Sequence, residues 1–219
     1  MPDSLTILRS AALAIAALLP IVNPAGSAPI FLSMTHGATS ATRVALARRI
    51  AINSLLLLLA AMFIGSYVLN LFGLSIAVVK IAGGLLVIAN GWHLIRSDEA
   101  PDSNLVKAPE WSPAEIQRQA FYPLTFPLTV GPGSVSVAIT IGAGTSEGGM
   151  QFIAVAGTLL GILVVSATIY VSFRYAARLL AMLGDTGSVV LLRLSAFILL
   201  AVGVQIFTDG LAERFKLFN

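Results

Sequence analysis

The chain contains no cysteine, and only 11% of its 219 residues are charged. Without thiols it forms neither disulfides nor thiolate metal sites, which excludes a disulfide scaffold and cysteine catalysis. Soluble domains carry charge on about a quarter of their residues, because their surfaces must be hydrated. Here hydrophobic residues make up 57% of the chain and the mean hydropathy is +0.92. These values predict an integral membrane protein and exclude a soluble or disordered one.

Several chemical signatures are also missing. The formal charge of +3 is spread along the chain, so nucleic acid is not an expected partner. No GxxxxGK[ST] phosphate loop is present, and neither His36 nor His93 has metal-ligand or triad-like neighbours. We therefore expect neither an enzyme nor a cofactor. No Asp or Glu lies in the middle of a long apolar run, which leaves open whether H⁺ or Na⁺ serves as a coupling ion.

The long apolar runs define the predicted fold. A helix needs about 20 apolar residues to cross about 30 Å of hydrocarbon. Backbone groups must be paired in lipid, and runs of this length are typical of helices and not of barrel strands. We predict an all-α, polytopic bundle with six crossings, at residues 5–35, 43–70, 74–95, 119–143, 149–173 and 189–208.

The chain divides into two halves of three crossings each. We predict a first repeat over residues 1–95, a polar cytoplasmic linker over 96–118 and a second repeat over 119–219. The pattern of Pro20 with Gly26-Ser27 recurs 107 residues later as Pro127 with Gly133-Ser134. Because each repeat crosses an odd number of times, the second copy is expected to be inverted, which is a common plan among secondary transporters.

The distribution of basic residues predicts orientation. Eight Lys and Arg residues lie at connections 1–2, 3–4 and 5–6, and three lie on the side of the two termini. The positive-inside rule then places those three connections in the cytoplasm and both termini outside. Lys80 and Arg193 instead fall inside the third and sixth crossings, 113 residues apart. We interpret them as gating residues or as anchors that reach the membrane interface.

Helix-breaking residues interrupt the first and fourth crossings at matching places. A break in hydrocarbon exposes backbone groups unless protein, water or a ligand pairs them, so both breaks should face the bundle interior. Each break is followed by a new half-helix, whose N-terminus attracts an anionic group such as a carboxylate. The predicted substrate-binding residues are Asn23, Pro24, Gly26, Ser27, Thr129, Gly131, Pro132, Gly133 and Ser134. The alternative is that these residues only kink the helices, with Asn23 capping its own backbone.

The two interruptions resemble those of a known family. The segments Asn23-Pro24-Ala25-Gly26-Ser27-Ala28-Pro29-Ile30-Phe31 and Pro123-Leu124-Thr125-Phe126-Pro127-Leu128-Thr129-Val130-Gly131-Pro132-Gly133-Ser134 are similar to those of the MarC family. Members more often read NPIGNIPIF in the first segment, so this chain departs from the family at Ala25, Ser27 and Ala28. The resemblance implies a multipass bacterial or archaeal inner-membrane protein, for which transport of small neutral amino acids has been proposed.

Our leading hypothesis is a secondary transporter whose substrate binds near the bilayer midplane between the two broken helices. A first alternative is an exporter of hydrophobic or drug-like compounds, with a wide cavity lined by aromatic residues such as Phe31, Phe121, Tyr122 and Phe126. A second is a membrane scaffold or regulatory protein, whose broken segments should be packed without a cavity. The expected partners are the lipid bilayer and a small molecule. The sequence leaves open whether the chain forms a homo-oligomer.

Overall fold

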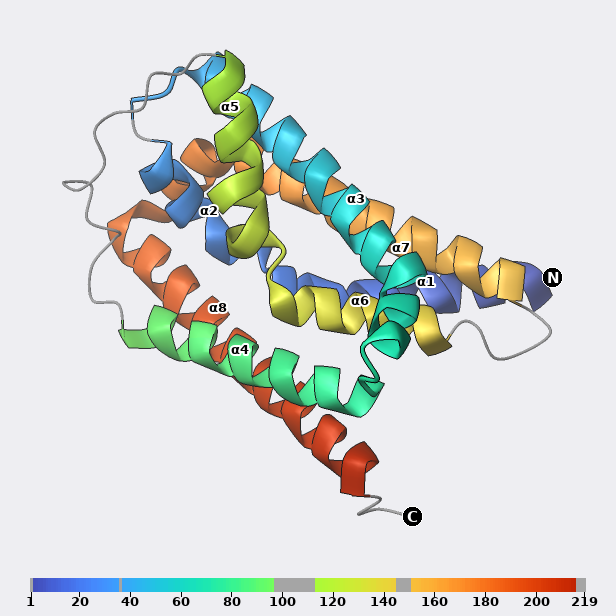
Figure 1. The fold of residues 1–219 in the computed structure, drawn as a ribbon. Helices are drawn as coiled ribbons and strands as arrows, with labels where there is room; N and C mark the ends of the chain where they lie inside the picture. Colours follow the sequence, from blue (N-terminus) through green and yellow to red (C-terminus); the bar gives the residue numbers. More distant parts are fainter. Residues whose placement is uncertain (1, 36, 97–112, 145–150, 216–219) are drawn as a thin grey trace.

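In a computed structural model, residues 2–35, 37–96, 113–144 and 151–215 are described, and these ranges contain helices and turns but no strand (Figure 1). The predicted all-α fold is therefore confirmed for the described residues. The elements are α1 (Pro2–Val22), α2 (Pro24–Met34), α3 (Ser40–Leu71), α4 (Ile76–Arg96), α5 (Pro113–Gln119), η1 (Ala120–Thr129), α6 (Pro132–Gly144), α7 (Gln151–Arg174) and α8 (Ala176–Phe215).

Among the described residues, five apolar helices are each long enough to cross a membrane. They are Ser4–Met34, Ser40–Leu71, Ile76–Arg96, Phe152–Arg174 and Thr186–Phe215. A bent pair, Ala114–Thr129 and Pro132–Gly144, makes a sixth crossing if it counts as one span. These segments agree with the polytopic bundle predicted from the sequence, although the last helix extends seven residues past the predicted end at 208.

The predicted linker, residues 96–118, differs from the structure at its end. Residues 97–112 lie outside the described ranges, but Pro113–Gln119 forms α5 and continues directly into η1. The fourth span therefore begins about five residues earlier than predicted. Another unpredicted feature is a kink at Gly184, near the start of α8, where φ is 65°. Glycine has no Cβ and adopts this left-handed conformation without steric cost.

The two interruptions have different geometries. A single residue separates α1 from α2: Asn23 is left-handed, with φ 44° and ψ 59°. Asparagine tolerates this conformation better than most residues, so one residue is enough to interrupt the helix. The second break bends the chain by 73° between η1 and α6. Within η1, before this bend, Tyr122 and Phe126 are each followed by proline and have extended dihedrals, because a residue before proline is pushed out of the helical region.

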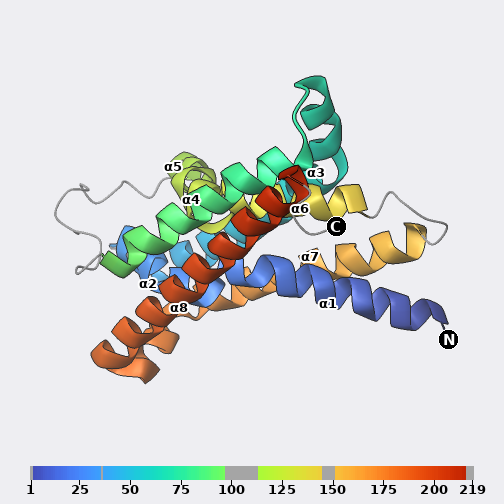
Figure 2. The same ribbon diagram turned by 90° about the horizontal axis from the view of Figure 1, so that it is seen from below.

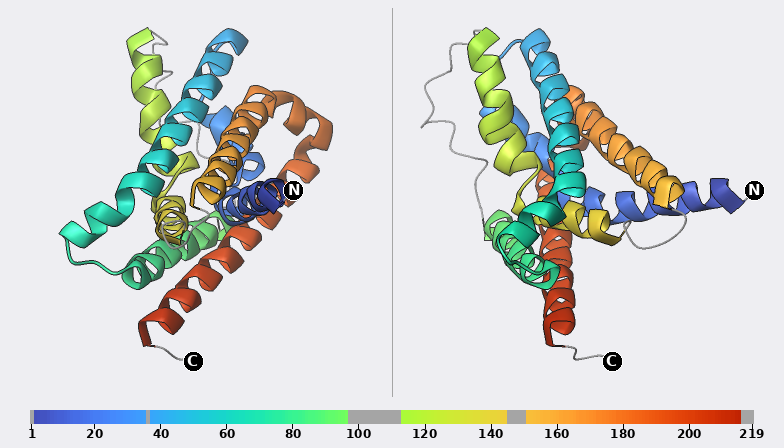
Figure 3. Two further views of the ribbon diagram at one scale, coloured as in Figure 1. Left: turned by 90° about the vertical axis from the view of Figure 1, so that its right-hand side faces the viewer. Right: turned by 45° about the vertical axis from the view of Figure 1, so that its right-hand side comes forward.

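Equivalent helices of the two halves make equivalent contacts. α1 packs along α7 as η1 packs along α3, α2 packs against α7 as α6 packs against α3, and α4 packs against α6 as α8 packs against α2. Two further pairs, α4 with α8 and α3 with α7, each join equivalent helices of the two halves (Figures 2 and 3). This pattern agrees with two similar three-helix units. Their inverted orientation in a membrane stays a prediction.

The contact between α4 and α8 is unusually close. A Cβ built on Gly84 would lie 2.6 Å from the backbone nitrogen of Phe207, and one on Gly203 would lie 2.7 Å from that of Ile88. Small residues allow helix backbones to approach in this way in membranes. Figure 2 shows the two helices side by side over most of the length of α4.

The apolar interior and the apolar outside have different roles. Inside, the rings of Phe31 and Phe173 stack with centroids 4.6 Å apart and join α2 to α7. Outside, large apolar side chains such as Leu71 and Phe152 are 82% and 92% exposed. In water such exposure would be costly, but it suits a surface that faces lipid.

Candidate functional site

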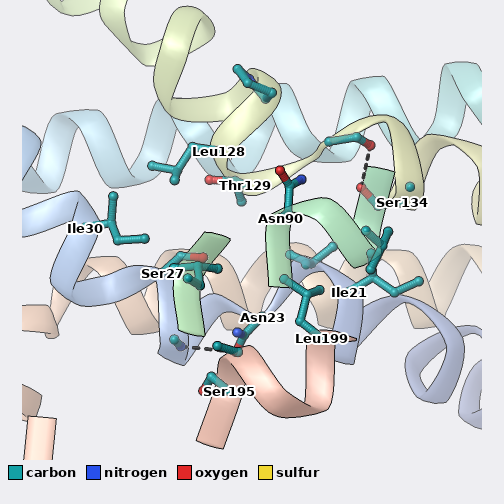
Figure 4. A pocket seen from close by; sticks show the side chains of 18 of the residues that line it. Ile21, Asn23, Ser27, Ile30, Asn90, Leu128, Thr129, Ser134, Ser195 and Leu199 are labelled. Atoms are coloured by element: carbon teal, nitrogen blue, oxygen red, sulfur yellow. Dashed lines mark hydrogen bonds between the residues drawn. The ribbon is translucent and has the colours of Figure 1, made fainter. Parts of the chain in front are cut away.

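A cavity of about 430 Å³ lies where the two interruptions meet (Figure 4). Its lining comes from α1, α2, α4, η1, α6 and α8. Seven of the nine residues predicted to bind substrate line it: Asn23, Gly26, Ser27, Thr129, Gly131, Gly133 and Ser134. The other two, Pro24 and Pro132, are not among the lining residues and instead begin α2 and α6.

The N-terminus of α2 is capped by its own chain. The side-chain Oδ1 of Asn23 accepts a hydrogen bond from the backbone N–H of Gly26 at 3.2 Å, and its carbonyl accepts one from Ser27 at 3.0 Å. Pro24, the first residue of the helix, has no N–H to satisfy. The alternative reading of Asn23 as a cap of its own backbone therefore describes its side chain correctly.

The N-terminus of α6 has a different arrangement. It follows Gly131, which has no side chain, and opens with Pro132, which has no N–H. The Ser134 hydroxyl donates to the Gly131 carbonyl at 2.9 Å and so does not cap the helix N–H groups. A helix leaves its first N–H groups without intrahelical partners, here those of Gly133 and Ser134. Ser134 is 1% exposed, so these groups lie in a buried part of the cavity wall.

Gly133 also allows α6 to pack closely against α4. A Cβ built there would clash with the side chain of Val87 on α4, and the Gly83 carbonyl oxygen lies 3.4 Å away. The close approach predicted between Gly133 and a substrate is thus accompanied by a close approach between α6 and α4. A large residue at this position would push the two helices apart.

Thr129 lines the cavity, but its hydroxyl already donates a hydrogen bond to a backbone carbonyl. The hydroxyl donates to the Leu124 carbonyl at 2.7 Å, and Thr125 makes the same kind of bond to Ala120 at 2.5 Å. Both threonines are buried in the irregular η1 segment. Their hydroxyls satisfy carbonyls that a regular helix would pair with backbone N–H groups. Only the lone pairs of the Thr129 oxygen remain for a ligand.

Three further polar side chains line the cavity and were not predicted from the sequence: Asn90 and His93 on α4, and Ser195 on α8. A Cβ built on Gly26 would lie 2.6 Å from the Cβ of Ser195, so Ser195 packs directly on the start of α2. Ser195 lies two residues after Arg193, and Ala82 lies two residues after Lys80, the residue 113 positions earlier that matches Arg193, so a small side chain at both places is the signal that could have identified Ser195. Of the described residues that line the cavity, His93 is the only ionisable one.

The two basic residues predicted inside crossings do not line the cavity. The Nζ of Lys80 lies 2.6 Å from the Glu213 carboxylate, an ion pair that joins the start of α4 to the end of α8. Arg193 is an exposed residue of α8. A direct contact between a substrate in this cavity and either residue has no support in the structure, and their role as gate or anchor stays a prediction.

The cavity extends toward one end of the bundle. Its lining includes Met34, the last residue of α2, and Leu94, near the end of α4. In the opposite direction α6 closes on α4, where the Ser136 hydroxyl donates to the Val79 carbonyl at 2.8 Å. The end toward which the cavity extends is the one that the charge distribution predicts to be cytoplasmic. A separate hollow of about 850 Å³, lined by Asn70 and Glu213 among others, lies at the other end.

The comparison with known proteins covers both broken segments that form the cavity. The family model for the MarC family integral membrane protein matches residues 8–215, which include both broken segments. The chain belongs to the MarC family. This confirms the resemblance drawn from the two broken segments, and it establishes an integral membrane protein.

MarC family relatives cover nearly the full chain. The UPF0056 membrane protein YvbG of Bacillus subtilis is 32% identical over 92% of this chain and 94% of its own length. The UPF0056 inner membrane protein MarC of Citrobacter koseri is 30% identical over 96% of this chain and 98% of its own. No solved structure matches the chain.

Proposed function

We propose that this MarC family member is a secondary transporter of small neutral amino acids. The observation that carries the proposal is the cavity of about 430 Å³ between two broken helices. Its volume falls within the range of about 300–1,000 Å³ typical of small-molecule sites. Broken helices that meet near the middle of a bundle are also a recurrent way to build transporter sites.

The polarity of the cavity supports a neutral substrate with a carboxylate. Neutral groups such as Asn23, Ser27 and Asn90 supply most of its hydrogen-bonding capacity, and the described lining contains no Asp, Glu, Lys or Arg. A ligand with a net charge would be buried there without a charged partner, which is costly. A zwitterionic amino acid can place its carboxylate at a helix N-terminus instead.

The alternative of an exporter of drug-like compounds has less support. That hypothesis expects a wide cavity lined by Phe31, Phe121, Tyr122 and Phe126, and none of the four lines this cavity. Phe31 is fully buried in the stack with Phe173. A scaffold or regulatory role is also less supported, because it predicts tightly packed broken segments without a cavity.

We further propose that the protein resides in the inner membrane with both termini on the periplasmic side. The name of the Citrobacter relative, which calls it an inner membrane protein, supports the location. The distribution of Lys and Arg supports the orientation. With this orientation the cavity would open toward the cytoplasm in the conformation described.

Uptake of radiolabelled glycine and L-alanine into proteoliposomes tests the proposed function. We expect saturable uptake or exchange that exceeds that of protein-free liposomes and that unlabelled glycine or alanine competes away. The protein should first be shown to be folded by its circular dichroism and its elution as a single species. Folded protein that gives no uptake or exchange across a panel of neutral amino acids would contradict the proposal.

A further inference from the structure

The two half-helices that meet at the cavity are not equivalent anion sites. The Asn23 side chain already occupies the Gly26 N–H at the start of α2. The start of α6 has no such cap, because Gly131 precedes it and the Ser134 hydroxyl donates in the other direction. Within the cavity, α6 is therefore the stronger anion-binding end.

Two serine hydroxyls on the other side of the cavity are available to a ligand. Ser27 on α2 and Ser195 on α8 are 8% and 9% exposed, and both line the cavity. Neither hydroxyl makes a hydrogen bond to any residue in the described parts of the chain, and neither oxygen is among the fully buried atoms there that lack a partner, so each retains accessible surface. Serines on membrane helices commonly bond to a carbonyl of the preceding turn, and these two do not. In Figure 4 both lie on the far side of the cavity from Ser134.

Near these two serines, the C-terminus of α1 adds partial negative charge, and the opposing N-terminus of α2 is capped at Gly26 by the Asn23 side chain. α1 is a 21-residue helix that ends at Val22, and Ile21 and Val22 line the cavity beside Asn23. The C-terminal end of a helix carries partial negative charge and stabilises a nearby cation. The lone pairs of serine oxygens accept hydrogen bonds from an ammonium group.

We infer that the cavity binds its substrate in one direction, with the carboxylate at the N–H groups of Gly133 and Ser134 and the ammonium at Ser27 and Ser195. The inference rests on the proposed function and makes it more specific. It selects substrates that carry both charged groups on one small molecule, as α-amino acids do. It also assigns to Ser195, on a third helix, direct contact with the substrate.

Binding of two ligands to the Ser195→Ala variant tests this assignment. L-alanine and propionate share a carboxylate and a short apolar body, but only alanine has an ammonium. Because propionate carries a net charge, we expect it to bind more weakly than alanine, and it is titrated over a wider concentration range. Each is used to compete with radiolabelled L-alanine on purified protein. We expect Ser195→Ala to weaken alanine binding by roughly tenfold, as loss of a hydrogen bond to a charged group does, and to leave propionate binding unchanged.

The matched control is Ser188→Ala on the same helix, where the exposed hydroxyl donates to the Gly184 carbonyl at 2.8 Å. It should leave both affinities unchanged. Equal weakening of alanine and propionate by Ser195→Ala, or no weakening of either, would overturn the assignment while the proposed function stands. Wild-type protein that binds no alanine would overturn the proposed function and this inference with it.

Discussion

At the scale of single residues, Asn23 shows how one side chain sets a break in a membrane helix. It holds a left-handed conformation that most side chains disfavour, and it also caps the helix that follows. Both properties suit asparagine, whose short amide reaches backbone groups and whose αL strain is small. The break therefore needs no insertion, and α2 can continue almost directly from α1.

Two substitutions of Asn23 distinguish the contribution of its left-handed conformation from that of its helix cap. Asn23→Ala should lower the free energy of unfolding by about 1–2 kcal/mol, because it loses the cap and places a Cβ in a left-handed conformation. Asn23→Gly should cost only a few tenths of a kcal/mol, since glycine is tolerated at both a cap and a positive φ. Thermal unfolding in detergent measures the difference. Equal losses for the two variants would show that the left-handed conformation at this position does not disfavour a Cβ.

Much of the candidate site was predictable from residue types, and the rest was not. Proline and glycine mark the two breaks wherever they occur in an apolar run, so Gly26, Ser27 and Gly133 could be assigned to the site. Asn90 and Ser195 lie in uninterrupted helical runs. Whether such a residue faces the cavity depends on how α4 and α8 rotate about their axes, and tertiary packing sets that rotation. No local pattern in the sequence predicts this rotation.

At the scale of elements, α4 and α8 make the most extensive helix–helix contact in the described part of the chain. Glycines from both helices bring backbone against backbone, and the Lys80–Glu213 ion pair joins their ends. Both helices also contribute to the cavity wall, through Asn90 and Ser195. We therefore expect the pair to behave as one unit against which α2, η1 and α6 are positioned.

Replacing one glycine of the α4–α8 contact by alanine should weaken the packing between the two helices. Gly203→Ala places a Cβ 2.7 Å from the backbone nitrogen of Ile88, so the helices must separate, at a cost of about 1–3 kcal/mol in stability. Gly144→Ala is the matched control, because a Cβ there meets nothing within 4 Å. It should be neutral or slightly stabilising. Thermal unfolding of both variants provides the comparison, and equal stability would contradict a close α4–α8 contact.

The bend between η1 and α6 shows the limit of prediction at this scale. The sequence predicts similar interruptions in the two halves, since Pro20 and Gly26-Ser27 match Pro127 and Gly133-Ser134. Each interruption contains three prolines, Pro20, Pro24 and Pro29 in the first and Pro123, Pro127 and Pro132 in the second. The first nevertheless departs from helical geometry at Asn23 alone, whereas the second bends by 73°. Proline removes a helical hydrogen bond and restricts the residue before it, but it does not set the size of the bend. Residue types therefore locate both interruptions without fixing their geometry.

At the scale of the whole molecule, the polytopic helical bundle follows from composition and run length. Hydrocarbon permits few backbone solutions, so apolar runs of about 20 residues identify helices with little ambiguity. The location of the cavity follows from the two breaks, because broken backbone in a membrane must be buried in protein or face a cavity. The structure adds where the cavity opens and which helices close it.

The central claim is that this cavity, and not the larger hollow at the other end of the bundle, carries the substrate. Asn90 and Asn70 are both exposed asparagines near helix ends, and each lines a different one of the two spaces. A tryptophan at either position would fill part of its own space and leave the other unchanged. The pair therefore distinguishes the two spaces with the same chemical change.

Uptake of radiolabelled L-alanine by Asn90→Trp and Asn70→Trp in proteoliposomes is the most direct test. Both variants should insert and elute as wild-type protein does. The account predicts that Asn90→Trp loses nearly all uptake while Asn70→Trp retains most of it. Full uptake by Asn90→Trp, or selective loss in Asn70→Trp, would contradict the claim that the substrate binds between the two broken helices.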